Sequence, residues 1–295
     1  MENNNQALRK PPWLKVKANF GPVYGEVKSL LDELKLHTVC QEANCPNIGE
    51  CFSARTATFI ILGDKCTRNC RFCDIKPGRP SALDCDEPKR VAEAVKRLNL
   101  KFAVITSVTR DDLADGGAGI FADCIRQIRR LKPGCLIEVL IPDLKGDTHS
   151  LNIVIEAAPE VLAHNVETVS RLYPKVRPQA DYRRSLDVLN YVSKSSTGII
   201  VKSGMMVGLG EDLGEIKQVL ADAAAAGCQI FTVGQYLSPS KEHVPVAKFY
   251  TPEEFDDIKS LGEELGIVQM VSGPLVRSSY LAHDQAEKFR QKANF

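Results

Sequence analysis

The 295-residue sequence lacks a charge imbalance, a membrane-length apolar run and a recognisable secretory leader. Lysine and arginine together number 38 and aspartate and glutamate 37, so no strong field favours nucleic acid or a membrane surface as a partner. No apolar run approaches the roughly 20 residues that span a bilayer. The polar start, MENNNQALRKPPWLKVK, has no apolar core like that of a signal peptide. We therefore expect a cytoplasmic protein with no membrane or nucleic-acid partner.

Cysteine is abundant, with ten residues, and six of them fall between positions 40 and 73. Disulfides are disfavoured in a reducing cytosol, so clustered cysteines there more often bind metal or take part in chemistry. The isolated Cys124, Cys135 and Cys228 stand in apolar patterns, where a free cysteine behaves as a small hydrophobe. We assign these three to the core and leave Cys85, in a polar loop, unassigned.

Short apolar runs alternate with amphipathic stretches along the chain, which predicts parallel βαβ units. The predicted strands are residues 56–62, 102–108, 135–141, 161–168, 198–209 and 230–237, and another apolar run covers 267–273. The fold class is therefore α/β, a partial (β/α)6 TIM-like barrel with extensions at both ends. The expected organisation is an N-terminal extension over 1–55, the barrel over 56–280 and a C-terminal tail over 281–295.

Capping boxes mark the starts of two predicted helices. Asp212 and Glu215 open one helix, which ends before Gly227, and Thr251 and Glu254 open another.

Cys66, Cys70 and Cys73 form a CxxxCxxC motif directly after the first predicted strand. In a parallel barrel such a loop lies at the C-terminal face, where active sites assemble. Three thiolates on a 4Fe–4S cluster leave one iron open to a substrate or cofactor. A zinc knuckle or a set of redox thiols is the alternative from the residues alone.

This motif, with the aromatic Phe72 before its last cysteine, resembles the signature of the radical S-adenosylmethionine superfamily. The resemblance implies that the open iron holds the amino and carboxylate groups of S-adenosylmethionine. One electron then cleaves this cofactor to methionine and a 5′-deoxyadenosyl radical.

A second set, Cys40, Cys45 and Cys51, has the spacing CxxxxCxxxxxC just upstream of the barrel. Taken alone, this set could be a zinc site or a second iron–sulfur centre. The two sets together resemble the lipoyl synthase family. The likeness extends along the chain, to RKPPWLKVK, TSVTRDDLADGGA, HNVETV, KSGMMVGLGE, QYLSPSKEHVPV and GPLVRSSY.

The resemblance implies that a serine of RSSY is the fourth ligand of an auxiliary 4Fe–4S cluster held by the second set. We carry this metal-ligating and catalytic role to Ser279, with Ser278 as the alternative, since neighbouring side chains on an extended segment point in opposite directions. Without the resemblance, RSSY would be an ordinary surface turn.

The activity implied by the resemblance is that of a sulfurtransferase. It inserts two sulfur atoms at carbons six and eight of an octanoyl group on a lysine of a lipoyl carrier protein, the H protein or an E2 lipoyl domain. Two S-adenosylmethionines are used and the auxiliary cluster is sacrificed. The implied partners also include an electron donor such as ferredoxin or flavodoxin, and an iron–sulfur cluster carrier for repair.

Further cofactor contacts are expected at the mouth of the barrel. Gly116 and Gly117 resemble a glycine-rich turn near the methionine amino group, or form a plain turn before a helix. Asn165 and Glu167 share one side of their strand and face the ribose, or belong to a core network. Arg177 suits a carboxylate, or lies on the surface.

Five other residues in these motifs also have predicted roles. We expect His164 to point away from Asn165 and Glu167 and to be structural. Lys241 and His243 either border the entry of the carrier or are solvated. Met205 and Met206 fit a buried strand, and either could line a tunnel for the octanoyl chain.

Two rival functions are a different sulfur-inserting radical enzyme, such as a biotin synthase or methylthiotransferase, and a non-catalytic iron–sulfur carrier. The first is not expected to have a CxxxxCxxxxxC loop ahead of its radical motif, and the second would close each cluster with four thiols.

Overall fold

The computed structural model describes residues 9–16, 21–195 and 198–292. Residues 1–8 and 293–295 of the predicted extension and tail, and Lys17 of the N-terminal motif, lie outside these ranges. Within them, the main sheet has the strand order β1-β2-β5-β6-β7-β8-β9-β10. Its strands are β1 (His37–Thr38), β2 (Thr58–Ile61), β5 (Phe102–Ser107), β6 (Leu136–Leu140), β7 (Val161–Ala163), β8 (Ile200–Val207), β9 (Ile230–Gln235) and β10 (Gln269–Gly273).

All neighbouring strands in this sheet are parallel except β1, which pairs antiparallel with β2. The six predicted strands are present as β2 and β5 to β9. The apolar run at 267–273 supplies β10, a further parallel strand next to β9. A partial (β/α) barrel is thereby confirmed.

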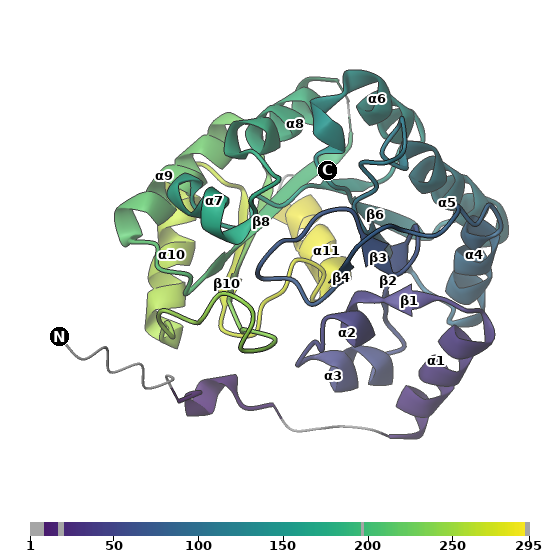
Figure 1. Ribbon diagram of the computed structural model, residues 1–295, viewed down its shortest axis with the longest axis horizontal. Helices are drawn as coiled ribbons and strands as arrows, with labels where there is room; N and C mark the ends of the chain where they lie inside the picture. Colours follow the sequence, from purple (N-terminus) through teal and green to yellow (C-terminus); the bar gives the residue numbers. More distant parts are fainter. Residues whose placement is uncertain (1–8, 17–20, 196–197, 293–295) are drawn as a thin grey trace.

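Helices surround the strands on the outside of the barrel (Figure 1). They are α4 (Glu87–Arg97), α5 (Ala118–Leu131), α6 (Thr148–Glu156), α7 (Tyr173–Val176), α8 (Tyr182–Ser195), α9 (Leu213–Ala225) and α10 (Pro252–Glu264), with the 3-10 turns η2 (Leu144–Gly146) and η3 (Ser170–Leu172). Both predicted capping boxes are present, Asp212 with Glu215 and Thr251 with Glu254. The predicted core cysteines are buried, as Cys124, Cys135 and Cys228 are at most 4% exposed.

The N-terminal part of the chain lies along the edge of the barrel (Figure 1). It contains η1 (Pro12–Leu14), α1 (Pro22–Glu33), β1, α2 (Val39–Glu42) and α3 (Ile48–Ser53). The indole of Trp13 donates a 3.1 Å hydrogen bond to the carbonyl oxygen of Tyr250, which ties η1 to the segment before α10. The rings of Tyr24 and Phe52 pack α1 against α3, with centroids 5.3 Å apart. Through β1 this extension is continuous with the main sheet.

Helix α11 (Ala282–Lys292) packs against the N-terminal ends of the strands. Its Ala286 and Phe289 join a separate apolar cluster with Phe102 of β5, Ile200 of β8 and Ile230 of β9. These strand residues lie on the inner face, because alternation places them on the same side as Thr106, Gly204 and Gly234, which line an inner cavity. Helix α11 is therefore a plug that fills the lower mouth of the barrel.

A buried ion pair lies between this plug and the upper half of the barrel. Lys202 of β8 donates hydrogen bonds of 2.8 and 3.0 Å to the two carboxylate oxygens of Glu138 on β6. Both side chains are almost inaccessible to solvent. Burial raises the pKa of Glu138, although the ammonium group of Lys202 opposes this shift.

Candidate active site

A cavity of about 600 Å³ lies inside the barrel at the C-terminal ends of the strands. Residues from both cysteine sets line it, together with the RSSY segment and inner residues of the strands. In the described residues, no three His, Cys, Asp or Glu side chains converge closely enough to hold one metal ion. The thiols instead surround a space. A cubane places each thiolate on a different iron, so it does not require the thiols to converge on one point.

The first cysteine loop follows β2 and contains the small strands β3 (Lys65–Cys66) and β4 (Lys76–Pro77), which pair with each other. The Cys66 sulfur accepts hydrogen bonds from the backbone N–H groups of Arg68, at 3.4 Å, and Thr109, at 3.3 Å. Backbone donors of this kind stabilise thiolate ligands and tune a cluster. Backbone N–H groups from two segments thus point at the sulfur of Cys66.

Contacts to the rest of the barrel rim hold the far side of this loop. The N–H of Arg71 donates to the carbonyl of Val176, and the N–H of Val244 donates to the carbonyl of Arg71. His243 places its Nε2 3.1 Å from the carbonyl oxygen of Cys73. His243 thus supports the cysteine loop, while Lys241, two residues earlier, is exposed.

Arg68 joins the first cysteine loop to two other loops of the barrel. Its guanidinium makes paired hydrogen bonds to Asp111, at 2.7 and 2.9 Å, and to Asp143, at 2.9 and 2.6 Å. Burial alone would raise the pKa of Asp143, but Arg68 holds that pKa well below its ordinary value. Two bidentate carboxylates fix both the position and the charge of the guanidinium.

The second cysteine loop runs through the short helices α2 and α3. Cys40 lies in α2, which Thr38 caps by accepting a hydrogen bond from the N–H of Gln41, and Cys51 lies in α3. Cys45 is between them, and its N–H donates to the carbonyl of Cys40 at 3.1 Å. All three cysteines line the cavity.

The RSSY segment is attached to this second loop at both ends. Asn47 donates a 2.8 Å hydrogen bond to the carbonyl of Leu275, and the Tyr280 hydroxyl lies 3.0 Å from a carboxylate oxygen of Glu50. Ser278 and Ser279 lie between these attachments, and both line the cavity. The structure therefore brings a serine-bearing segment to the second cysteine set, as the resemblance implies.

Several of the cysteine thiols have raised pKa values. Burial raises the pKa of Cys40 and of Cys73 to about 12 and that of Cys51 to about 11, and neighbouring cysteines of the same set add to each shift. The same causes raise the pKa of Cys70, although Arg177 opposes the shift. Such thiols become thiolates when a cation binds them, with release of protons.

Polar side chains with unused hydrogen-bonding atoms form another part of the cavity wall. Asn165 donates a 3.2 Å hydrogen bond to Glu167, but its Oδ1 is buried and has no partner in the described residues. Nη1 of Arg177 donates to the carbonyls of Asn165 and Val166, at 3.0 and 3.1 Å, while its buried Nε has no partner there. These atoms fit a polar ligand.

Glu167 has a left-handed backbone, with φ of 64°. Its N–H donates to the carbonyl of Gly204, and its own carbonyl accepts from Met206, so β8 holds this strained conformation. Burial raises the pKa of the Glu167 carboxyl, while Arg177 opposes the shift. The strain turns a carboxyl group toward the cavity.

His164 differs from its predicted orientation. Strand β7 ends at Ala163, so alternation no longer applies, and His164 lines the same cavity as Asn165 and Glu167. Its Nδ1 lies 2.9 Å from the carbonyl oxygen of Ile141, and its Nε2 is buried without a partner in the described residues. Burial lowers the pKa of His164 to about 4. The ring is therefore neutral, with Nδ1 as the donor and Nε2 as a free acceptor.

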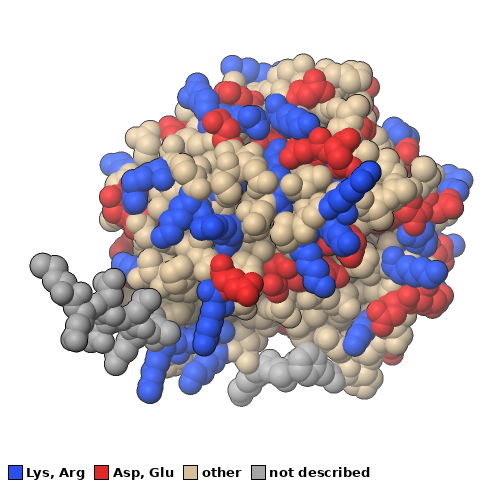
Figure 2. All heavy atoms as spheres, in the orientation of Figure 1, with Lys and Arg blue, Asp and Glu red and all other residues tan. Residues whose placement is uncertain are grey.

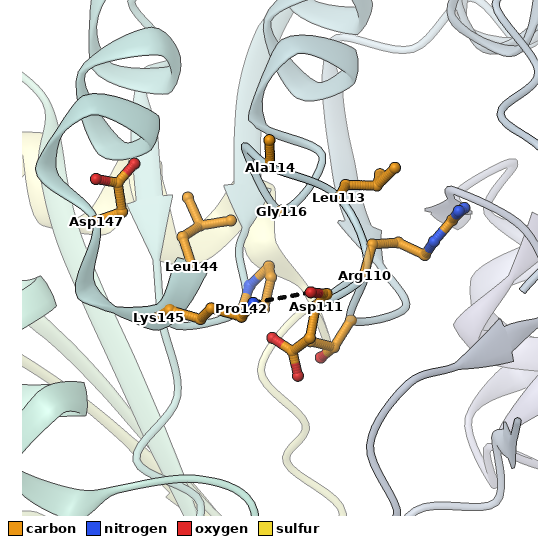
Figure 3. Close-up of a pocket in the computed structure, with 10 residues that line it drawn as sticks. Arg110, Asp111, Leu113, Ala114, Gly116, Pro142, Leu144, Lys145 and Asp147 are labelled. Carbon is orange, nitrogen blue, oxygen red and sulfur yellow. Dashed lines mark hydrogen bonds between the residues drawn. The ribbon is translucent and has the colours of Figure 1, made fainter. Parts of the chain in front are cut away.

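Gly116 and Gly117 do not line the large cavity. Gly116 lies instead in a small separate pocket of about 40 Å³, between the loop before α5 and η2 (Figure 3). A Cβ at Gly116 would meet Leu144, and one at Gly117 would meet Leu62. Asp115 accepts hydrogen bonds from the N–H groups of Gly117 and Gly119, which starts helix α5. The geometry of Gly116 and Gly117 therefore favours a plain turn before a helix over a contact with the cofactor.

The remaining predicted residues of the site are placed as follows. Phe72, Met205 and Met206 all line the large cavity, and Cys85 is exposed away from it. Sequence reasoning missed the roles of Arg68 and His243 as braces. Arg68 lies inside the cysteine motif, but no feature of the neighbouring sequence identifies Asp111 and Asp143 as its partners.

The surface around the barrel mouth carries charges of both signs, interspersed in Figure 2 without one dominant patch. No helix within the described ranges has the length and apolar character that a membrane crossing requires.

Solved structures share the fold of this chain at low sequence identity. Methylornithine synthase (PylB) has a TM-score of 0.53 at 16% identity, with 75% of this chain and 72% of that chain covered. HydG, a maturase of the FeFe-hydrogenase, has a TM-score of 0.55 at 17% identity, with 73% and 55% covered. SuiB of Streptococcus suis, solved with bound S-adenosylmethionine, has a TM-score of 0.52 at 14% identity, with 74% and 51% covered.

Sequence comparisons are more specific. The model of the radical SAM superfamily matches residues 60–223, and that of the N-terminal domain of lipoyl synthase matches residues 1–45. Lipoyl synthase from Rubrobacter xylanophilus is 55% identical over 96% of this chain and 88% of its own length. Lipoyl synthase from Caldicellulosiruptor bescii is 55% identical over 94% of this chain and 95% of its own length. The chain therefore belongs to the lipoyl synthase family of the radical S-adenosylmethionine superfamily.

Proposed function

We propose that this protein is a lipoyl synthase that inserts two sulfur atoms, at carbons six and eight, into the octanoyl group of a lipoyl carrier protein. The observation that carries this proposal is the single cavity shared by two separate three-cysteine sets and a serine-bearing segment. An enzyme of this kind needs a radical generator and a sulfur source within reach of one substrate. A shared cavity provides that arrangement.

Each cysteine set has its own cluster in this proposal. Cys66, Cys70 and Cys73 hold the cluster that binds S-adenosylmethionine. The auxiliary cluster is held by Cys40, Cys45, Cys51 and Ser279. When bound, these groups supply an electron, a hydrogen-abstracting radical and sulfide. Serine is a harder ligand for iron than thiolate, so Ser279 suits a cluster that must give up sulfur.

The polar wall of the cavity binds S-adenosylmethionine. The guanidinium of Arg177 would pair with the cofactor's carboxylate, and Asn165 and Glu167 would accept hydrogen bonds from its ribose hydroxyls. Nε2 of His164 offers a further acceptor. The turn at Gly116 and Gly117 is left out of these contacts because it faces Leu144 and Leu62. Phe72 packs beside the cofactor from the cysteine loop.

The apolar part of the same cavity holds the octanoyl chain. Ile60, Leu140 and Met206 project into it from three different strands. No side-chain base can remove a proton from an unactivated carbon at a useful rate, because the carbanion has no stabilisation. The protein therefore orients the chain between the two clusters and excludes water from the reacting carbons.

The partners follow from this reaction. The substrate is an octanoylated H protein or E2 lipoyl domain, the electron comes from a ferredoxin or flavodoxin, and an iron–sulfur carrier restores the auxiliary cluster. A reducing cytoplasm suits a chain that must keep six ligand thiols free.

The test separates the two clusters. Cys45→Ala leaves Cys66, Cys70 and Cys73 intact, so a folded variant should still cleave S-adenosylmethionine but should yield no dithiol product from an octanoyl-lysyl peptide. Cys70→Ala is the matched control and should lose both activities. Mass spectrometry of the peptide and chromatography of 5′-deoxyadenosine provide the two readouts. A dithiol product from Cys45→Ala would refute the proposal.

A further inference from the structure

Arg277 lies in the wall of the cavity without a carboxylate partner. Within the described ranges, the only hydrogen bond of its side chain runs from Nη1 to the carbonyl oxygen of its neighbour Val276, at 2.7 Å. Arg68 forms a contrast, because two carboxylates surround its guanidinium. Most of the hydrogen-bonding capacity of Arg277 is therefore unused by the protein itself.

The backbone around Arg277 is built to bring the guanidinium inward. A Cβ on Gly234 of β9 would collide with the Val276 carbonyl and would lie 3.3 Å from Nη1 of Arg277. The segment thus rests directly on the inner face of β9. The attachments of Asn47 to Leu275 and of Tyr280 to Glu50 hold it there.

The second cysteine set lies beside Arg277. Leu275, two residues before Arg277, accepts the 2.8 Å hydrogen bond from Asn47, which is two residues after Cys45. Arg277 and Cys45 line the same cavity. Arg277 is half-buried, and a partly desolvated guanidinium gains stability from a nearby counter-charge. A cubane held by three thiolates and an alkoxide is anionic and offers sulfur acceptors.

We propose that Arg277 is the counter-charge of the auxiliary cluster and donates hydrogen bonds to its sulfur atoms. This inference rests on the proposed function, since it requires a cluster on Cys40, Cys45 and Cys51. Arg277 stabilises the more negative, reduced form of that cluster and so raises its reduction potential. It also slows the loss of iron before sulfur is needed.

The experiment uses the full chain with Cys66, Cys70 and Cys73 all changed to serine, so that only the auxiliary cluster is present. The reduction potential is measured by potentiometry with electron-resonance detection, and iron loss is timed with a chelator. Arg277→Met should lower the potential and speed iron loss at least severalfold. Arg277→Lys keeps the charge, so its reduction potential and its rate of iron loss should be closer to those of the parent. Arg130→Met, at an exposed arginine of α5 outside the cavity, is the control and should leave the auxiliary potential unchanged.

Each outcome is decisive. If Arg277→Met had the same reduction potential and the same rate of iron loss as the parent, the proposal would be overturned. Loss of the cluster in Arg277→Met but not in Arg277→Lys would support it, because charge is then the difference. Loss in both variants, with circular dichroism like that of the parent, would overturn the charge role in favour of a purely steric one. The iron content of the parent, expected at about four per chain, tests the proposed function separately, and an iron-free parent would overturn both.

Discussion

At the scale of single residues, the site depends on side chains whose polar atoms the protein leaves unsatisfied. His164 Nε2, Asn165 Oδ1 and Arg177 Nε are buried atoms without a partner in the described residues, and all three residues line one cavity. Native proteins rarely leave such atoms unpaired, since each lost hydrogen bond costs about 1–3 kcal/mol. Their concentration here indicates where a polar ligand completes the structure.

The choice between the two serines of RSSY is also a question of one residue. If Ser279 is the fourth ligand of the auxiliary cluster, Ser279→Ala should speed the loss of its iron to a chelator, because one iron loses its protein ligand. Ser278→Ala is the matched control and should behave as the parent. Iron release is followed by absorbance in chains with Cys66, Cys70 and Cys73 changed to serine. The reverse order of the two variants would transfer the role to Ser278.

Acid stability provides a test of His164. Its pKa is lowered from 6.5 to about 4 in the folded chain. The unfolded chain therefore binds more protons in this window, so stability is full above about pH 6.5 and falls toward pH 4, by at most about 3 kcal/mol.

The variant His164→Asn should remove most of that dependence, because the amide keeps a donor for the carbonyl of Ile141 but does not titrate. Urea unfolding of the metal-free chain at about pH 7 and about pH 4.5 makes the comparison. The pKa of Asp143 is already low, so it contributes little in this window. An equal loss of stability in parent and variant would show that His164 titrates normally.

At the scale of elements, the close approach of the RSSY segment to β9 depends on a missing side chain. A Cβ on Gly234 would collide with the carbonyl group of Val276. Gly234→Ala should therefore displace Ser279 and Arg277 from the second cysteine set, with a loss of stability of about 1–3 kcal/mol.

The expected result for Gly234→Ala is impaired assembly of the auxiliary cluster with cleavage of S-adenosylmethionine largely retained. Iron analysis and 5′-deoxyadenosine formation measure the two effects. Gly25→Ala is the matched control, since its Cβ would meet nothing within 4 Å. Full auxiliary iron in Gly234→Ala would mean that the segment can shift without losing its role.

At the scale of the whole molecule, the barrel is divided into a plugged lower half and a hollow upper half. Helix α11 fills the lower mouth with Ala286 and Phe289, and the pair of Lys202 and Glu138 lies above it. Loops from most of the strands then surround the cavity. The plug and the ion pair give these loops a rigid base.

Breaking the ion pair should destabilise the whole chain. Lys202→Met leaves a buried carboxylate without its partner, and the free energy of unfolding should fall by about 3–5 kcal/mol. Burial raises the pKa of Glu138, so this carboxyl is protonated as the pH falls toward 4.5, the ordinary pKa of a glutamate. The stability lost in Lys202→Met should therefore be smaller at that pH than at about pH 7.

The double variant Lys202→Met with Glu138→Leu should recover most of that loss, because no charge remains in the core. Urea unfolding of the three chains measures the difference. If the double variant were as unstable as the single one, packing rather than charge would be the cause.

The sequence alone determined the features that depend on near neighbours. Strand and helix order follow from periodicity, and both capping boxes join residues three positions apart, Asp212 with Glu215 and Thr251 with Glu254. The cysteine spacings, with the resemblance they carry, predict both sets of cluster ligands, and the structure places both sets on one cavity. Contacts between residues a few positions apart can be predicted from sequence, because the backbone allows few arrangements over so short a distance.

Tertiary structure alone decided which distant residues meet. Asp111 and Asp143 reach Arg68 across 43 and 75 positions, and Asn47 reaches Leu275 across 228. Local pattern failed at His164, because β7 ends at Ala163, five residues before the end of the predicted strand at 168. It also gave no sign that Arg277 would lack a carboxylate. Such pairings depend on how closely packed elements bring their surfaces together, and no interaction between neighbouring residues specifies that.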